Sequence, residues 1–217
     1  SLSKETQQKK DFHHIQEVIN QGMPVVLFDR VTNDVFCDKV IIDDQQAAFD
    51  AVQFFIEHRF KKIALITTVD YVSVGKLRTD GYKKALKLNN IEVNEDLIIK
   101  IEDIENCSIK IENLIKSQKC DAIFAVNELF AVTAIKIAAK NNLKVPEDIS
   151  VIGFTDGIIS QFSTPSISTV SQNGIKMGRK AAQMLIDRLE LEDEEDEHYK
   201  TEIIETNLII RESTTTK

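Results

Sequence analysis

The sequence predicts an α/β protein in which parallel sheets are flanked by helices on both faces. Short apolar runs rich in β-branched residues alternate with amphipathic stretches along all 217 residues. Several of these runs, such as 25–28 and 122–126, are apolar at consecutive positions, which is typical of strands buried on both faces. The connections are short, and no linker is rich in Pro, Gly or Ser. Repeated strand–helix units of this kind form parallel sheets through right-handed crossovers.

The strands are expected where β-branched and aromatic residues cluster between polar segments. These runs are 24–29, 39–42, 62–67, 97–101, 121–126, 149–154 and 203–210.

The helices are expected between the strands, and three of them have clear patterns. Asp44 can cap a helix whose apolar face recurs with helical spacing from Ala47 to Ile56. A second helix opens at Asn127 and Glu128, and its acidic start suits the helix dipole. A third runs over 172–190. Weaker helical patterns cover 6–21, 74–89 and 108–118.

Composition restricts the classes of partner. Lys and Arg number 27 against 35 Asp and Glu, so the net charge is −8. An acidic chain repels phosphate backbones, and these residues are therefore not expected to form a DNA-binding surface. The acidic segment 190–197 is expected to be a solvated loop. No apolar run approaches the roughly 20 residues of a membrane-spanning helix, and the three widely spaced cysteines favour free thiols in a reducing cytosol.

The elements divide unevenly along the chain. Residues 44–163 alone supply enough strand–helix units for a complete small sheet. Residues 1–43 and 164–217 together supply about half of a second one. Either the protein is one domain with irregular ends, or the beginning of a second α/β lobe is missing.

No enzyme signature accompanies the polar residues that follow the strands. Ligand sites in open α/β sheets lie at the carboxyl ends of strands, where this chain places Asp29, Tyr71, Ser73, Asn127 and Asp156. No Gly-rich phosphate loop, zinc motif or nucleophile motif is present. The adjacent histidines 13 and 14 point in different directions on a helix and cannot clasp one metal ion. The sequence predicts no catalytic residue, no metal site and no cofactor, so it predicts a protein that is not an enzyme.

Several segments resemble LacI/GalR-type transcriptional repressors. The segment VPEDISVIGFTD (145–156) resembles the family's VPEDISVIGFDD stretch, and STPSISTVSQ (163–172) resembles its TPPLTTVRQ segment. Further segments match in order, and the match runs nearly end to end: GMPVVLFDR (22–30), VIIDD (40–44), RTDGY (78–82), FAVNE (124–128) and the closing LIIREST (208–214).

The resemblance implies a two-lobed fold of the type I periplasmic-binding-protein class, with parallel sheets flanked by helices and an incomplete N-terminal lobe. Residues 1–43 then form a partial N-terminal lobe and 44–163 the C-terminal lobe. Residues 164–205 return to the N-terminal lobe, and 206–217 form the final strand and tail of the C-terminal lobe. The helix-turn-helix domain, the hinge helix and the first strands of the N-terminal lobe are absent from this sequence.

The resemblance also assigns ligand-binding positions. Arg78 matches an arginine that binds ligand hydroxyls or a carboxylate, and Asn127 and Asp156 match residues that bind a sugar or a base nitrogen. Asp29 and Gln172 match positions that close over the ligand, and the loop residues Ser73 and Tyr71 complete the set. Each of the first five also has a structural alternative: Arg78 paired with Asp70 or Asp80, Asn127 as a helix N-cap, Asp156 bracing the turn at Gly157, Asp29 beside Arg30, and Gln172 as a helix-start residue.

The resulting hypothesis is the effector-binding region of a cytoplasmic LacI-type repressor. A small sugar-like effector binds between the lobes of a homodimer and changes how the missing domains meet operator DNA. No membrane partner is expected. The alternative from another class is an extracytoplasmic sugar-binding receptor of a transporter or sensor system, which shares the fold and ligand chemistry. The free cysteines and the closing REST segment (211–214) favour the repressor. A third interpretation, an α/β enzyme, is disfavoured by the missing catalytic groups.

Overall fold

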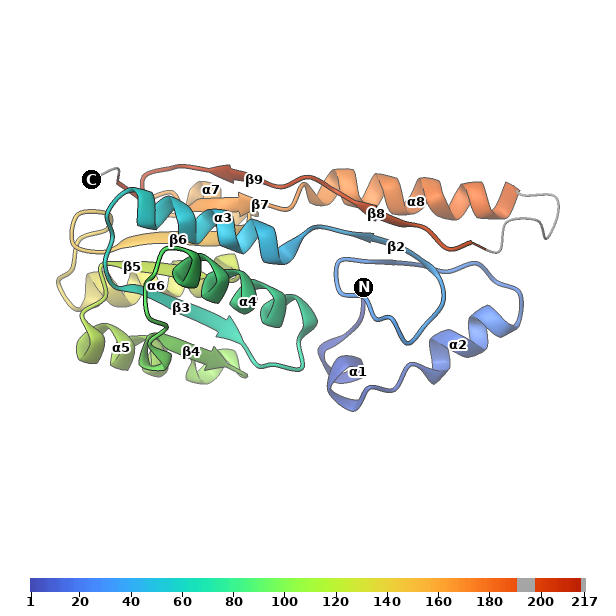
Figure 1. Ribbon diagram of the computed structural model, residues 1–217, viewed down its shortest axis with the longest axis horizontal. Coiled ribbons are helices and arrows are strands. Elements are labelled where there is room, and N and C mark those ends of the chain that lie inside the picture. Colours follow the sequence, from blue (N-terminus) through green and yellow to red (C-terminus); the bar gives the residue numbers. More distant parts are fainter. Residues whose placement is uncertain (191–197, 216–217) are drawn as a thin grey trace.

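The chain folds around two sheets that lie end to end in an elongated molecule (Figure 1). The structure is a computed structural model, and it describes residues 1–190 and 198–215; the acidic segment 191–197 falls outside these residues. The α/β class with mostly parallel strands is confirmed, because eight of the nine described strands pair in parallel and only the last pairs antiparallel. None of the described helices combines the length and the apolarity needed to cross a bilayer.

The smaller sheet has the strand order β1-β2-β8. Its strands are β1 (Val26–Phe28), β2 (Asp38–Ile41) and β8 (Thr201–Ile203). Three helices accompany it, α1 (Lys4–Lys9), α2 (His13–Asn20) and α8 (Gly174–Glu190), and α8 packs against β1 and β2. We call these elements the small lobe. A compact apolar cluster joins Leu2, Leu27, Val35 and Cys37 to side chains of α2.

The larger sheet has the strand order β4-β3-β5-β6-β7-β9. Its strands are β3 (Ile63–Thr68), β4 (Ile98–Ile101), β5 (Ala122–Ala125), β6 (Ser150–Thr155), β7 (Ser168–Ser171) and β9 (Asn207–Ile209). Its helices are α3 (Asp44–Glu57), α4 (Ser73–Leu88), α5 (Cys107–Gln118), α6 (Glu128–Lys140) and α7 (Ile158–Phe162), with short 3-10 turns η1 (Glu95–Leu97) and η2 (Ile104–Asn106). We call these elements the large lobe.

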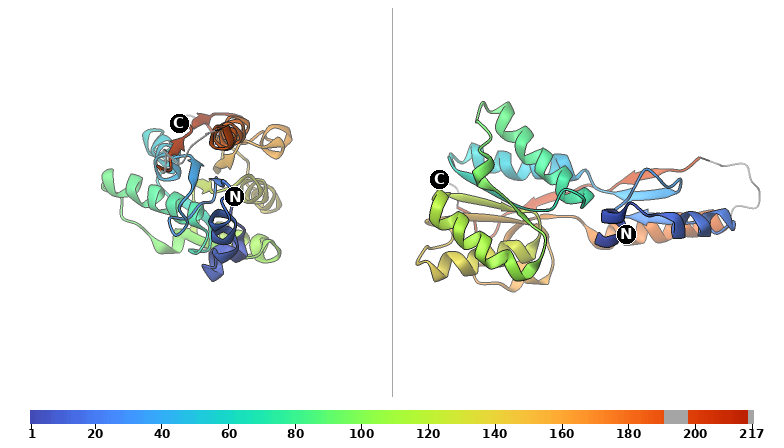
Figure 2. Two further views of the ribbon diagram at one scale, coloured as in Figure 1. Left: turned by 90° about the vertical axis from the view of Figure 1, so that its right-hand side faces the viewer. Right: turned by 90° about the horizontal axis from the view of Figure 1, so that it is seen from below.

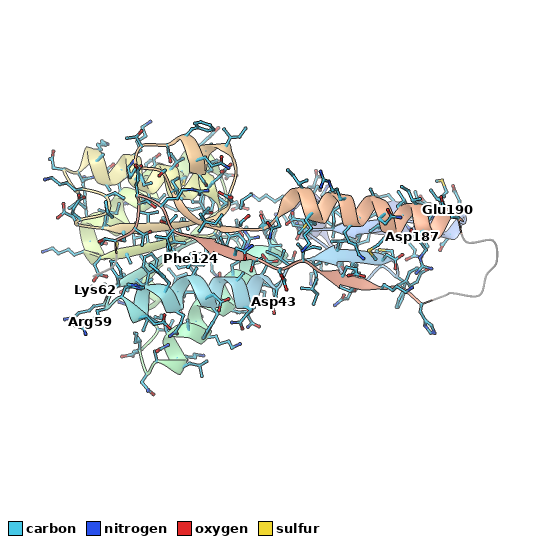
Figure 3. The ribbon with its side chains drawn as sticks, turned by 90° about the horizontal axis from the view of Figure 1, so that it is seen from above. Asp43, Arg59, Lys62, Phe124, Asp187 and Glu190 are labelled. Carbon is cyan, nitrogen blue, oxygen red and sulfur yellow. The ribbon has the colours of Figure 1, made fainter. Side chains whose placement is uncertain are left out.

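Helices cover both faces of the larger sheet, as expected for strands that are apolar at consecutive positions. Figure 2 shows α3 and α4 on one face and α5 and α6 on the other. The central strands are buried on both sides: every residue of β5 and the first five residues of β3 are buried. Phe124 lies within this core, whereas Asp43 stands at the end of α3 that faces the small lobe (Figure 3).

Three crossovers connect the lobes, and they fix which strand ends face each other. The chain passes from β2 to α3, from β7 to α8 and from β8 to β9. Because the first two crossovers leave the carboxyl ends of β2 and β7, the carboxyl ends of both parallel sheets face the junction between the lobes. Ligand sites in open α/β sheets lie at such ends.

The structure corrects four expectations about the elements. The run 203–210 is not one strand, because β8 pairs with β2 and β9 pairs with β7 in the other sheet. Strand β7 lies within the predicted returning segment 164–205, yet it hydrogen-bonds to β6 of the large lobe. The helix expected over 6–21 is divided at Lys10, whose φ is 52°. The residue that caps α3 is Asp43, whose carboxylate accepts from the Gln46 amide, and Asp44 is the first helical residue.

Candidate functional site

Six of the seven predicted site residues follow a strand or begin a helix along the junction, and Arg78 lies in the second turn of α4. Asp29 follows β1 of the small lobe. In the large lobe, Tyr71 and Ser73 follow β3, Asn127 follows β5, and Asp156 and Gln172 follow β6 and β7. The strand order therefore places the large-lobe residues in one row, at the carboxyl ends of neighbouring strands. Their roles as ligand contacts stay a prediction.

Arg78 reaches this row from the second turn of α4, and it is only 4% exposed. Its Nε and Nη2 atoms both lie 2.7 Å from Asp44 Oδ1, and Nη1 donates to the carbonyl of Val126 over 2.6 Å. The guanidinium also lies 3.6 Å from the ring centroid of Phe154. These contacts use three of the five guanidinium N–H donors. Two donors thus have no acceptor among the described residues, which is compatible with a ligand oxygen.

The ion-pair partner of Arg78 is neither of the two acidic residues considered from sequence. Asp70 pairs instead with Lys100, whose Nζ lies 2.6 Å from Asp70 Oδ2. Asp44 stands at the start of α3, where its side chain is 4% exposed. Burial raises the pKa of the Asp44 carboxyl, and the neighbouring Arg78 guanidinium opposes that rise. The pair holds the first turn of α3 beside the end of β5.

Asn127 is the N-cap of α6, because its Oδ1 accepts from the Phe130 amide over 2.8 Å. The side-chain amide N–H groups of Asn127 make no hydrogen bond within the described residues, so they are free to donate. The following residue, Glu128, accepts from both the amide and the hydroxyl of Ser160. It thereby ties the start of α6 to α7.

Asp156 lies in a backbone segment with unusual dihedral angles. Thr155 and Asp156 have φ of 109° and 61°, positive values that residues other than glycine adopt only uncommonly. The Asp156 carboxylate accepts from Arg211 Nη2 over 2.7 Å, and Arg211 also donates to the Ile167 carbonyl. One carboxylate oxygen of Asp156 is therefore occupied, and the other accepts no hydrogen bond from the described residues.

Asp29 and Gln172 meet across the junction. Gln172 Nε2 donates to Asp29 Oδ1 over 3.3 Å, a contact between residues 143 positions apart. Asp29 has a φ of 62°, and its other carboxylate oxygen lies 3.8 Å from Arg30 Nε. The proximity to Arg30 anticipated from sequence is thus present alongside the contact between lobes.

Tyr71 and Ser73 lie at the edge of the row and contact acceptors that sequence analysis did not identify. The Tyr71 hydroxyl donates to Glu102 Oε1 over 2.9 Å. The Ser73 amide and hydroxyl both donate to Gln7 Oε1, over 3.0 and 2.8 Å. The Tyr71 and Ser73 hydroxyl groups therefore already donate to acceptors within the protein.

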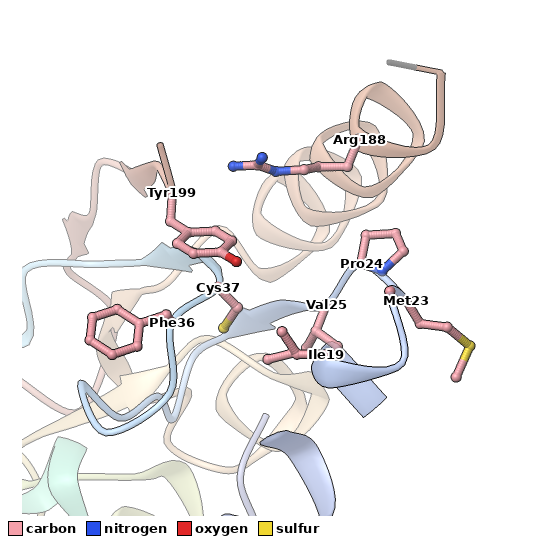
Figure 4. Close-up of a pocket in the computed structure, with 9 residues that line it drawn as sticks. Ile19, Met23, Pro24, Val25, Phe36, Cys37, Arg188 and Tyr199 are labelled. Carbon is pink, nitrogen blue, oxygen red and sulfur yellow. The ribbon is translucent and has the colours of Figure 1, made fainter. Parts of the chain in front are cut away.

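A cavity touches the predicted site at Asp156. It has a volume of about 480 Å³ and lies between the β6–α7 loop and the start of α8, with Asp156, Ser171 and Asn173 in its lining. Another, smaller cavity of about 230 Å³ lies in the small lobe, with Arg188, Tyr199 and Cys37 in its lining (Figure 4). That cavity contains none of the predicted site residues. Within residues 1–190 and 198–215, no three His, Cys, Asp or Glu side chains gather as metal ligands.

Sequence analysis missed the residues that hold the row in place. They are Asp44, Gln7, Glu102, Glu128 and Arg211. Arg211, Asp44 and Glu128 carried a signal, because all three lie within segments that resemble the repressor family. The positions of Gln7 and Glu102 had no local signal, since each is defined by contact with a loop more than 30 residues away.

A family-level comparison matches most of the chain. Residues 52–214 match the family described as periplasmic binding protein-like domain. The chain is 37% identical over 180 residues to the transcriptional regulator MalR of Clostridium butyricum, a match that covers 82% of this chain and 52% of MalR. The chain thus spans about half the length of the curated relatives it matches.

Solved structures show the same fold. A complex of the transcriptional regulator CelR with cellobiose is 27% identical, superposes with a TM-score of 0.81, and is matched over 90% of this chain and 60% of CelR. A LacI family regulator from Enterococcus faecium with bound ribose superposes with a TM-score of 0.86 at 21% identity. That match covers 95% of this chain and 77% of the Enterococcus protein.

Proposed function

The chain belongs to the LacI/GalR family of periplasmic-binding-protein-like transcriptional regulators, and from that premise we propose that it binds a small sugar-like effector between its two lobes. Binding of the effector would change the relative population of two lobe arrangements and thereby the DNA affinity of the whole regulator. No bond is made or broken in this process. The relatives are transcriptional regulators, which favours this function over an extracytoplasmic receptor or an enzyme.

The observation that carries the proposal is the meeting of polar side chains from both lobes at the carboxyl ends of their strands. Gln172 and Asp29 touch across the junction, and Arg78, Asn127 and Asp156 follow neighbouring strands of the large sheet. Together they offer a guanidinium fork, amide donors and carboxylate acceptors. Such a mixture recognises the vicinal hydroxyls of a sugar, which both donate and accept. The related CelR binds cellobiose, which supports a carbohydrate as effector.

The test is a calorimetric screen of mono- and disaccharides, cellobiose included, and nucleosides on the full gene product. The proposal predicts binding of one sugar class, which Asp29→Asn weakens at least tenfold because a carboxylate acceptor is lost. Asp50→Asn is the matched control, since Asp50 is exposed on α3 and, among the described residues, its carboxylate accepts from Gln46 of the same helix alone. Absence of binding by every compound would reject the effector, and equal affinities in the two variants would remove Asp29 from the site.

We further propose that the regulator is a cytoplasmic homodimer that meets operator DNA through a helix-turn-helix domain outside these 217 residues. An exposed apolar patch supports self-association. Ile158 and Phe162 of α7 are 76% and 80% exposed, and Leu129 of the neighbouring α6 is 36% exposed. Exposed apolar side chains that cluster on one face mark interaction surfaces.

A further inference from the structure

Helix α1 of the small lobe contacts the large lobe at a place remote from the three crossovers. Its N-terminal end is anchored in the small lobe, where the Leu2 amide donates to the Arg30 carbonyl and the Leu2 side chain joins the apolar cluster. Its other contacts reach the β3–α4 loop and the segment after β4. Strands β3 and β4 stand at the opposite edge of the sheet from β7 and β9, next to which the chain crosses between lobes.

Gln7 makes the central contact. Gln7 is only 6% exposed, and its Oε1 accepts from both the amide and the hydroxyl of Ser73, the first residue of α4. The first amides of a helix lack acceptors within the helix, and a side chain at the N-cap usually supplies one. The N-cap residue of α4 is Val72, which makes no such bond. Gln7 therefore supplies to α4 a cap that comes from the other lobe.

Lys4 contacts the same edge one turn earlier on α1. Its Nζ donates to the Glu102 carbonyl, lies 3.9 Å from Asp103 Oδ1 and stands 5.9 Å from the ring centroid of Tyr71. Tyr71 in turn donates to the Glu102 carboxylate. Two side chains of one short helix thus bind a single cluster of large-lobe residues, which includes the predicted site residues Tyr71 and Ser73.

We propose that α1 is a latch that holds the two lobes closed, and that Gln7 is its positioning residue. A rotation about the crossovers moves the opposite sheet edge most, so opening must break the Gln7–Ser73 and Lys4–Glu102 contacts first. Opening also leaves the N-terminal amide of α4, the helix that carries Arg78, without its acceptor. The latch couples the order of α4 to lobe closure.

This latch has a consequence for the effector that rests on the proposed function. An effector that binds only the closed arrangement has an apparent affinity reduced by the fraction of closed molecules. Loss of the latch lowers that fraction, so it weakens effector binding although Gln7 does not touch the effector. The test of the latch itself needs no ligand, so its failure is distinct from a failure of the sugar screen.

The first measurement is the hydrogen-exchange rate of the Ser73 amide by NMR in the ligand-free protein. Gln7→Ala should raise this rate at least tenfold, because the amide loses its acceptor. Gln7→Glu should restore it to within about threefold, because a carboxylate also accepts and suits a helix N-terminus. Gln8→Ala is the matched control, since Gln8 is exposed on the same helix. Amides of β5 should exchange equally in all variants, which shows that global stability is unchanged.

The second measurement is small-angle X-ray scattering of the double variant Lys4→Ala/Gln7→Ala, which should have a larger radius of gyration than the parent chain. If Gln7→Ala does not fold, Lys4→Ala alone replaces it in both measurements, because the Lys4 side chain is 41% exposed. Unchanged Ser73 exchange would overturn the proposal. Faster exchange with an unchanged radius of gyration would reduce the contact to a local helix cap and would equally overturn the latch.

Discussion

At the scale of single residues, the site is organised by pairs whose members are far apart in sequence. Arg78 and Asp44 are 34 positions apart, and Asp156 and Arg211 are 55 apart. The sequence predicted that Asp156 lies at a strand end, because strands and their termini leave a local pattern, and the family resemblance assigned Arg78 to the same site. It did not predict their partners, since an ion pair requires only that two side chains meet in space. The identity of the partner is a property of the packed lobe.

The Arg78–Asp44 pair yields a prediction about stability. Arg78→Met should lower the free energy of unfolding by about 3–5 kcal/mol, because it leaves the buried Asp44 carboxylate without its cation. The double variant Arg78→Met/Asp44→Leu should recover most of this loss, since neither charge then remains buried. Urea unfolding followed by circular dichroism measures both values. A double variant as unstable as the single one would show that the guanidinium acts mainly through Val126 and Phe154.

Cys120 yields a prediction about pH. This thiol is 7% exposed, and burial raises its pKa from an ordinary value near 9.0 to about 11. Between these values the unfolded chain ionises while the folded chain stays protonated, so the contribution to stability is complete below pH 9 and is lost as the pH rises towards 11. The free energy of unfolding should fall by about 1–2 kcal/mol from pH 8 to pH 10 through this group. Cys120→Ala should show a correspondingly shallower decrease, and equal slopes in both proteins would contradict the prediction.

At the scale of elements, the hydrophobic pattern predicted most strands and helices but failed where polar atoms replace apolar packing. Strand β7 is buried although it consists largely of hydroxyl residues, and it was not among the expected runs. The Ser168 hydroxyl exchanges hydrogen bonds with the backbone of Arg211, and Ser213 Oγ accepts from the Ser168 amide. The burial of Ser168 is therefore stabilised by partners more than 40 residues away, and the local hydrophobic pattern cannot predict such partners.

The division between β8 and β9 has a similar cause. The run 203–210 was predicted to be one strand, although the polar residues 205–207 interrupt it. At this break the Ile204 amide donates to the Ile41 carbonyl, and Asn173 Nδ2 donates to the Glu205 carbonyl. These bonds turn the chain from one sheet into the other. The polar residues 205–207 mark where the strand ends, but the acceptors and donors come from the relative placement of the two lobes. The change of sheet could therefore not be predicted from the segment itself.

The close contact of α3 with α4 depends on one glycine, which gives a prediction for an element. A Cβ atom at Gly81 would lie 2.2 Å from the Gln45 carbonyl oxygen and 2.9 Å from Ala48 Cβ, so the helices would have to separate. Gly81→Ala should lower the free energy of unfolding by about 1–3 kcal/mol. Gly178→Ala is the matched control, because a Cβ there meets nothing within 4 Å and the helix should gain about 0.5–1 kcal/mol. Urea unfolding distinguishes the two signs, and stabilisation by both substitutions would contradict the close approach.

At the scale of the whole molecule, the lobes are joined by three crossovers at one side and by the α1 contacts at the opposite sheet edge. Between these two connections lie the residues that we propose bind the effector. This arrangement gives an effector two ways to influence lobe closure, by bridging Asp29 to the large lobe and by adding to the latch contacts at Ser73. The family resemblance predicted the two-lobed fold from the sequence, whereas the latch required the lobes to be placed relative to each other.

Self-association gives the prediction that belongs to this scale. Phe162 is 80% exposed and stands beside Ile158 on α7, so a second copy that covers this patch removes a large apolar area from water. Phe162→Glu should weaken the proposed homodimer at least a hundredfold, because it removes a large aromatic contact and places a charge in a desolvated interface. Ile175→Glu on α8 is the matched control, since Ile175 is 76% exposed but lies on the other lobe. Analytical ultracentrifugation over a concentration series measures both affinities. An equal loss in the two variants would place the interface elsewhere, because a patch confined to α6 and α7 cannot respond to a charge on α8.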